Sequence, residues 1–213
     1  YKEFHLTRDN GHRQVVIWES DGTCEYIGEA RAFGIYQQIS RILTSCYNPV
    51  TFDQIFPWHH AAGDFIIKQA KDEFKVKLIT VRGYQNLTEF DPEQPDGKIH
   101  ILPALLMFVL NLTLRMRLDR LNGTGEPAMV GQGVMPSVIN GILQGLEDRS
   151  HSGRCENLAD NFIAFYNQFT FEQILEIMKH ILESAPPAGA EFELVNNNFY
   201  AHFENVSAVF NAL

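Results

Sequence analysis

Apolar and polar residues follow a strand-like pattern at the start of the chain. Residues 14–19 are rich in β-branched and aromatic side chains, the turn-forming residues 20–23 come next, and residues 24–27 resume the strand-like pattern. This arrangement predicts a β-hairpin. From 29 to 44, apolar residues recur every three or four positions, which predicts a helix with one apolar face. Pro49 prevents the helix from continuing.

A second hairpin is predicted in the middle of the chain. Residues 64–68 and 75–81 both read as strands, and a charged connection joins them. The polar, proline-containing stretch 89–98 that follows is the clearest loop in the sequence. We take it as an internal boundary within a single domain, 1–213, between a mixed α/β region, 1–88, and a mainly helical region, 99–213.

The second half of the chain has helical periodicity. The apolar spacing predicts four helices and two shorter elements, a strand and a final amphipathic turn: helices at 102–121, 137–146, 158–166 and 171–184, the strand at 192–195 and the turn at 206–213. Strands in the first half and helices in the second indicate an α+β fold, in which N-terminal hairpin elements and a central hairpin pack on a mainly helical C-terminal half.

Composition and charge limit the classes of partner that the chain is expected to bind. The 213 residues include 17 basic and 26 acidic ones, for a formal net charge of −9, which argues against nucleic acid or an anionic membrane as the main partner. The apolar run 101–114 is too short to span a membrane and predicts a buried helix. Three widely spaced cysteines and no apolar leader favour a reducing compartment, and we expect a cytoplasmic location. Cofactor, substrate and oligomeric state stay open.

The densest chemistry lies in residues 57–64, which we call the histidine loop. It contains His59, His60 and Asp64, with a glycine before the aspartate and a strand-like run after it. Imidazoles and a carboxylate can relay a proton or hold a phosphate when their polar atoms converge, so we take these three residues as candidate catalytic groups. Asp64 carries the most weight, because aspartate is disfavoured in strands.

Other roles for the histidine loop stay open. Adjacent histidines point to opposite sides of an extended chain, and the spacing matches no common zinc motif, so no metal ligand is assigned. In a purely structural interpretation, one histidine packs beside Trp58 while the other caps a turn or bonds a carbonyl, and Asp64 also caps a turn.

Arginines form a second group of candidates. Arg117 and Arg120 are three residues apart near the end of the helix predicted at 102–121, where together they could clamp an anion. Arg115 and Asp119, four apart, could pair on another face. Alternatively, these basic residues complement the negative end of the helix dipole. With Arg82, which follows the second hairpin, Arg117 and Arg120 make up the candidate ligand-binding set.

The order of helix, histidine loop, Gly63-Asp64, hairpin and helices resembles the C-terminal lobe of aminoglycoside phosphotransferases and choline-kinase-like enzymes. Their pattern is HGDxxxxN, then two strands and an Ile-Asp metal motif. The resemblance covers about residues 14–150, and it implies a kinase-like fold with a phosphate-handling loop at 57–64.

The catalytic positions of that family are degenerate here. If Asp64 matches the metal-binding asparagine, His59 stands at the catalytic aspartate and Thr80 replaces the metal aspartate. If Asp64 instead matches the catalytic aspartate, Ala62 replaces the preceding histidine and Gln69 the asparagine. Magnesium-assisted phosphoryl transfer needs those oxygen ligands, so we expect catalysis to be impaired or absent.

Three hypotheses follow. The first is a degenerate kinase-like domain that binds an anionic or phosphorylated small ligand near His59, His60, Asp64 and Arg82. The second is a metal-dependent hydrolase that uses His59, His60 and Asp64. The third is a non-enzymatic interaction protein in which the histidine loop is structural.

Overall fold

The computed structural model describes residues 1–9, 11–19, 21–60, 63–70, 73–88, 100–151, 156–184, 186–187 and 189–213. Its strands are β1 (Phe4–Asp9), β2 (His12–Trp18), β3 (Cys24–Gly28), β4 (Asp53–Ile55), β5 (Phe65–Ala70), β6 (Glu73–Leu78), β7 (Tyr84–Asn86), β8 (Leu118–Arg120) and β9 (Pro127–Met129). Its helices are α1 (Glu29–Cys46), α2 (Ile101–Arg115), α3 (Met135–His151), α4 (Leu158–Tyr166), α5 (Phe171–Ser184) and α6 (Ala190–Phe210), with short 3-10 turns η2 (Leu121–Gly123) and η3 (Gln132–Val134).

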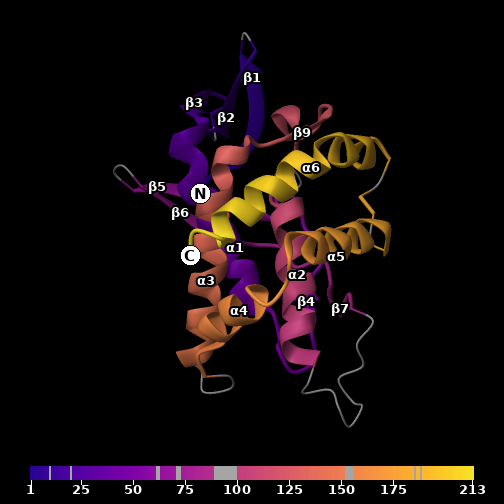
Figure 1. Ribbon diagram of the computed structural model, residues 1–213. Helices are drawn as coiled ribbons and strands as arrows, with labels where there is room; N and C mark the ends of the chain where they lie inside the picture. The colour runs from indigo at the N-terminus through magenta and orange to yellow at the C-terminus, as the bar shows by residue number, and fades with distance from the viewer. Residues whose placement is uncertain are drawn as a thin grey trace.

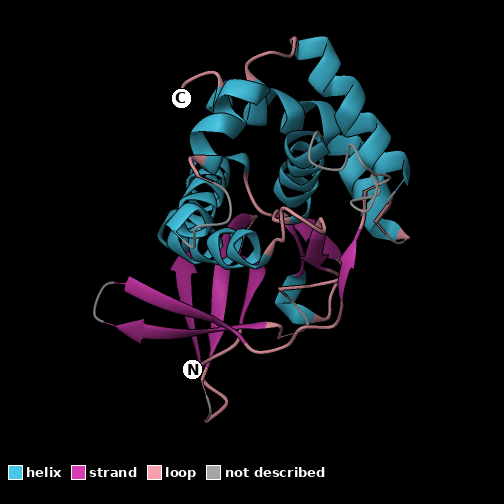
Figure 2. Ribbon diagram, turned by 90° about the horizontal axis from the view of Figure 1, so that it is seen from below, coloured by secondary structure: helices cyan, strands magenta, loops and turns pink. Residues whose placement is uncertain are grey.

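The architecture confirms the predicted α+β fold. Most strands gather at one side of the molecule and the helices of the second half lie at the other (Figure 2). The predicted first hairpin is β2–β3, and β1, which the pattern did not reveal, pairs with β2 to complete a three-stranded antiparallel sheet. The predicted boundary at 89–98 lies outside the described residues.

The second hairpin is also present. β5 pairs with β6 in antiparallel register, with Phe65 opposite Leu78 and Ile67 opposite Val76. On either side of this hairpin in the chain lie β4 and β7, which pair with each other, Ile55 opposite Tyr84. Along the chain, the histidine loop therefore joins a strand of the β4–β7 pair to a strand of the β5–β6 pair.

Helices α1 and α3 pack closely against each other. Gly141 and Gly145 of α3 face α1, and a Cβ added at Gly141 would lie 2.1 Å from the backbone oxygen of Gln37. The Ser40 hydroxyl lies 2.9 Å from the Val138 carbonyl and donates to it across the interface. Arg41 of α1 reaches Asp148 of α3 through Nε at 2.7 Å. Small residues therefore allow the two backbones to approach closely.

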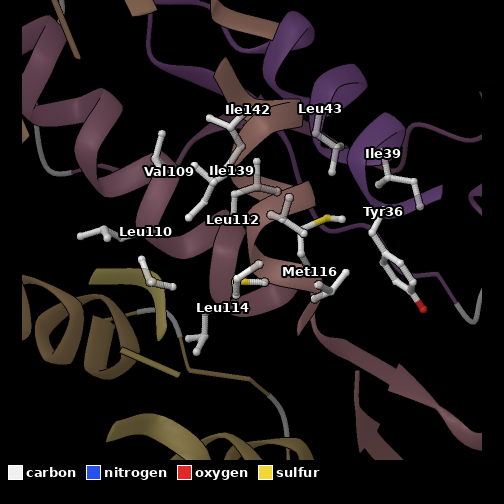
Figure 3. Close-up of a cluster of buried hydrophobic side chains, with 14 of the residues drawn as sticks. Tyr36, Ile39, Leu43, Val109, Leu110, Leu112, Leu114, Met116, Ile139 and Ile142 are labelled. Carbon is white, nitrogen blue, oxygen red and sulfur yellow. The ribbon is translucent and has the colours of Figure 1, made fainter. Parts of the chain in front are cut away.

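The core lies where α1, α2 and α3 meet. Figure 3 shows side chains of all three helices directed into one cluster, which includes Ile39, Leu43, Val109, Leu112 and Ile139. The apolar run 101–114 forms α2, whose residues from Ala104 to Leu114 are buried except for the half-buried Met107, as predicted for a buried helix. In the described chain, no helix combines the length and the apolar character that a membrane crossing requires.

Two predictions for the second half are wrong. Residues 192–195 and 206–213 were expected to be a strand and a separate turn, but both lie mainly in α6 (Ala190–Phe210). Val195, Phe199, Phe203, Val206 and Phe210 are buried along one face of this helix. Their spacing of three and four is the helical pattern, but the short run 192–195 at the start of α6 also fits a strand when it is taken alone.

The helix predicted at 102–121 is also too long. α2 ends at Arg115, and the chain turns into β8, which pairs with β9. The leucines in 102–121 continue the apolar spacing past Arg115, so periodicity alone could not place the helix end.

Candidate functional site

Asp64, the last residue of the histidine loop, makes several of the contacts that hold the loop in place. Its side chain is fully buried, and Oδ2 accepts a hydrogen bond from the backbone N–H of His59 at 2.9 Å. The Nε–H of Arg82 donates to both carboxylate oxygens, at 3.0 Å and 2.9 Å. The Asp64 carbonyl accepts from the N–H of Ile79 at 2.9 Å. One residue thus ties the start of the loop to the chain that leaves β6.

His60 points into the protein and is enclosed by aromatic rings. Its ring centroid lies 5.3 Å from that of Tyr36 and 5.4 Å from that of Trp58, and Phe4 and Phe65 complete the enclosure. Burial, with smaller effects from His59 and His5, lowers the pKa of His60 to about 3. The Leu118 backbone raises the pKa of His60 by a smaller amount. Within the described chain, however, neither ring nitrogen makes a hydrogen bond of normal geometry. His60 therefore packs as a neutral aromatic residue.

His59 takes the opposite direction and is exposed. The two imidazoles do not converge, as their adjacent positions in an extended loop imply. The Arg82 side chain is 40% exposed although it pairs with the buried Asp64. Its hydrogen bond to that carboxylate, and then the carboxylate charge, raise the pKa of Arg82. The backbone of the exposed His59 and the guanidinium of Arg82 therefore both contact the one buried carboxylate.

Arg117 and Arg120 are not a clamp, which corrects the helical prediction. They lie in and beside β8, and Arg117 is buried while Arg120 is exposed. Arg117 donates through Nε to the Val130 carbonyl at 2.9 Å, and Arg120 pairs with Glu191 at 2.9 Å. In a strand, residues three apart point to opposite sides, so the two guanidinium groups cannot share one anion.

The predicted pair between Arg115 and Asp119 is also absent. Arg115 donates through Nε to Asn111 at 2.9 Å and lies over the Phe56 ring, 4.7 Å from its centroid. Asp119 accepts from the backbone N–H of Leu6 at 2.8 Å and joins β8 to β1. Burial raises the pKa of Asp119 to about 7.

Sequence reasoning missed the buried polar group around His202. The guanidinium of Arg117 lies 3.3 Å from His202 Nδ1, and the Thr113 hydroxyl lies 3.4 Å from Nε2. Because arginine only donates, Nδ1 is the acceptor and Nε2 carries the proton. Burial, then the Arg117 charge, lowers the pKa of His202 to about 3. Recognising α6 from its apolar spacing would have placed His202 on the buried face.

The chain's own residues do not fit the magnesium site that the family resemblance implies. Both oxygens of Asp64 already face the Arg82 guanidinium, and Thr80 is an exposed hydroxyl where the family has a carboxylate. Across the described segments, no three His, Cys, Asp or Glu side chains are grouped as a metal ion would require. This geometry does not favour the metal-dependent hydrolase.

The fold and the loop define the chain as an α+β protein with an internally paired histidine loop. No protein-family model, no curated protein and no solved structure matches it.

Proposed function

We propose that the chain is a non-catalytic binding domain in which the histidine loop is structural. One observation carries the proposal: Asp64 is fully buried, and its carboxylate is engaged by Arg82 and by the backbone of His59. A catalytic carboxylate must instead present an oxygen to a substrate or a metal. His60, enclosed by aromatic rings with a lowered pKa, is equally withdrawn from chemistry at neutral pH.

The order of elements supports a kinase-like ancestry for this domain. Helix α1, the histidine loop, the β5–β6 hairpin and then mainly helices follow one another as in the C-terminal lobe of the phosphotransferases that the sequence resembles. Beside Asp64, the positive charge comes from Arg82. In this proposal the arginine stabilises the loop where an active enzyme would use a metal ion.

Changing Asp64 to asparagine tests the structural role. Asp64→Asn is expected to lower the free energy of unfolding by roughly 1–2 kcal/mol, because the buried acceptor loses its charge-assisted hydrogen bonds. Arg82→Ala is expected to destabilise as well, and the double variant should be less destabilised than the sum of the two, as for groups in contact. Urea denaturation measures all three.

The exposed pair of Arg31 and Glu25 is the control for that cycle. Both side chains are about as exposed as Arg82, at 45% and 36%, so Glu25→Gln should change the free energy of unfolding by less than about 0.5 kcal/mol. If Asp64→Asn left stability unchanged or raised it, Asp64 would behave as a residue kept for function at the expense of stability, and the structural role would be wrong.

A second candidate function rests on the outer surface of the same loop. There the Arg82 guanidinium is partly exposed, and the exposed His59 contacts the same carboxylate through its backbone. Arginine is a common partner of phosphate. A small anionic or phosphorylated ligand could bind at this surface without catalysis.

Thermal unfolding in the presence of inorganic phosphate, ATP and a sugar phosphate tests this second candidate. At about ten times its Kd, a ligand should stabilise the protein by about 1.4 kcal/mol, and Arg82→Ala should remove the effect. Arg31→Ala, which changes an arginine of similar exposure elsewhere, should preserve it. A flat response across the three compounds would eliminate the anion site but would leave the structural role of Asp64 intact.

A further inference from the structure

A groove between the end of α5 and the start of α6 lies away from the histidine loop. Its volume is about 800 Å³, and the two helices lie next to each other at one edge of the molecule (Figure 1). The apolar residues that line it are Leu182, Pro186, Pro187, Phe192, Phe199 and Tyr200. Its polar lining residues, Lys179, Glu183 and Asn196, do not converge on a buried point, because all three are exposed or partly exposed.

The apolar lining residues of the groove differ in their exposure. Leu182 and Phe199 are buried and form the floor, whereas Phe192 and Tyr200 remain 40% and 60% exposed. Phe192, Asn196 and Tyr200 follow one another at intervals of four, so they form a stripe along two turns of α6. Exposed aromatic rings beside an apolar floor are the anchors that protein partners use.

The helices around the groove are acidic. α5 and α6 together carry six glutamates against one lysine, and that lysine, Lys179, is paired with Glu176 at 2.7 Å. Glu183 lines the groove and is exposed. Glu191 is paired with Arg120, whereas Glu183 and Glu193 are exposed. The groove therefore offers apolar contacts with exposed glutamates at its edge, and its complement is an apolar segment flanked by positive charge.

We propose that this groove binds a basic amphipathic helix of a partner protein. Such a helix would place apolar side chains at intervals of three and four against Phe192 and Tyr200, with lysines or arginines toward Glu183 and the neighbouring glutamates. This inference rests on the proposed role as a binding domain and names the partner class.

A labelled 18-residue peptide with leucines at helical spacing and lysines elsewhere is the probe, and fluorescence anisotropy on the full chain is the measurement. We expect binding that Tyr200→Ser and Phe192→Ser each weaken at least tenfold, and that Glu183→Lys and added salt also weaken. Both aromatic side chains are exposed, so the variants should keep the fold, which circular dichroism verifies. Val50→Ser, which changes an exposed apolar residue outside the groove lining, should bind as the unmodified chain does.

Several results would overturn the proposal. These are an unchanged Kd in both aromatic variants, equal binding of a peptide with glutamates in place of lysines, and tighter binding of a proline-rich peptide. A dimer in light scattering that Tyr200→Ser dissolves would show that a second copy occupies the groove. Each of these outcomes is independent of the Asp64→Asn experiment, so failure of the groove and failure of the structural histidine loop can be told apart.

Discussion

Gly141→Ala is expected to lower the free energy of unfolding by about 3 kcal/mol, because overpacking a tight interface forces backbone shifts. A Cβ at this position would lie 2.1 Å from the Gln37 backbone oxygen and 2.2 Å from the Ser40 hydroxyl oxygen. The backbone oxygen cannot rotate away as a flexible side chain could. The contact joins α1 to α3, so the loss should appear in the global unfolding transition measured with urea.

Gly34→Ala is the matched control for this prediction. Gly34 lies within α1, is exposed, and has no atom within 4 Å of an added Cβ. Alanine there restricts the unfolded chain and favours helix, so it should raise stability by about 0.5–1 kcal/mol. Opposite signs for the two substitutions would show that α1 and α3 are in close backbone contact. Two variants of equal stability would contradict that contact.

The second large effect concerns acid stability and His60. The pKa of His60 is about 3 in the folded protein, against an ordinary value of 6.5. Below pH 6.5 the unfolded chain takes up a proton that the folded chain does not, so stability falls as the pH decreases toward 3. At pH 4 the loss from this residue is about 3 kcal/mol. His60→Phe should remove this loss, because phenylalanine does not titrate and suits the aromatic surroundings.

The measurement is urea unfolding of both proteins at pH 4 and pH 7.5. At pH 7.5, His60→Phe should destabilise by about 1 kcal/mol, because phenylalanine is somewhat larger than histidine but the substitution removes no polar contact of normal geometry within the described residues. Asp119 affects the pH dependence of stability in the opposite direction. Because its pKa is raised to about 7 in the folded protein, its contribution to stability falls as the pH rises from 3.8 toward 7. That contribution is common to both proteins and cancels in the difference.

His202 is the control, because it has the same lowered pKa but real polar partners. His202→Phe should also weaken the acid dependence, yet it should cost about 2 kcal/mol at pH 7.5, since Arg117 and Thr113 lose their contacts with the ring. If His60→Phe were as costly as His202→Phe at pH 7.5, His60 would have a polar partner, and its assignment as a packing residue would be wrong.

Local patterns were sufficient for part of the fold. The turn residues 20–23 and the β-branched runs around them predicted β2–β3, and the apolar spacing from 29 to 44 predicted α1. The errors came where a short apolar run fits two periods. Residues 192–195 read as a strand by themselves, and only the buried positions up to Phe210 make the helical period of α6 evident.

The sequence drew attention to the histidine loop, but the contacts that its residues make depend on the fold. The sequence singled out Asp64 because aspartate is unusual at the head of a strand. In the structure, its carboxylate accepts hydrogen bonds from the backbone of His59 and from Arg82. Its pairing with Arg82, 18 residues later, depends on how the chain returns after the β5–β6 hairpin. The wrong end of α2 had the same origin, because the pairing of β8 with β9 competes with the helix and periodicity does not report such pairing.

Local sequence patterns were enough to predict the α+β class, the β2–β3 and β5–β6 hairpins, the buried helix α2 and the segment richest in titratable side chains. These features depend on side-chain periodicity and on turn residues, which act over a few positions along the chain. The inward-facing ring of His60, the pairing of Arg82 with Asp64 and the separate environments of Arg117 and Arg120 became evident only from the folded chain. Burial and charge pairing are set by residues distant in sequence, and they determine whether a titratable side chain is available for chemistry or is used to hold the fold.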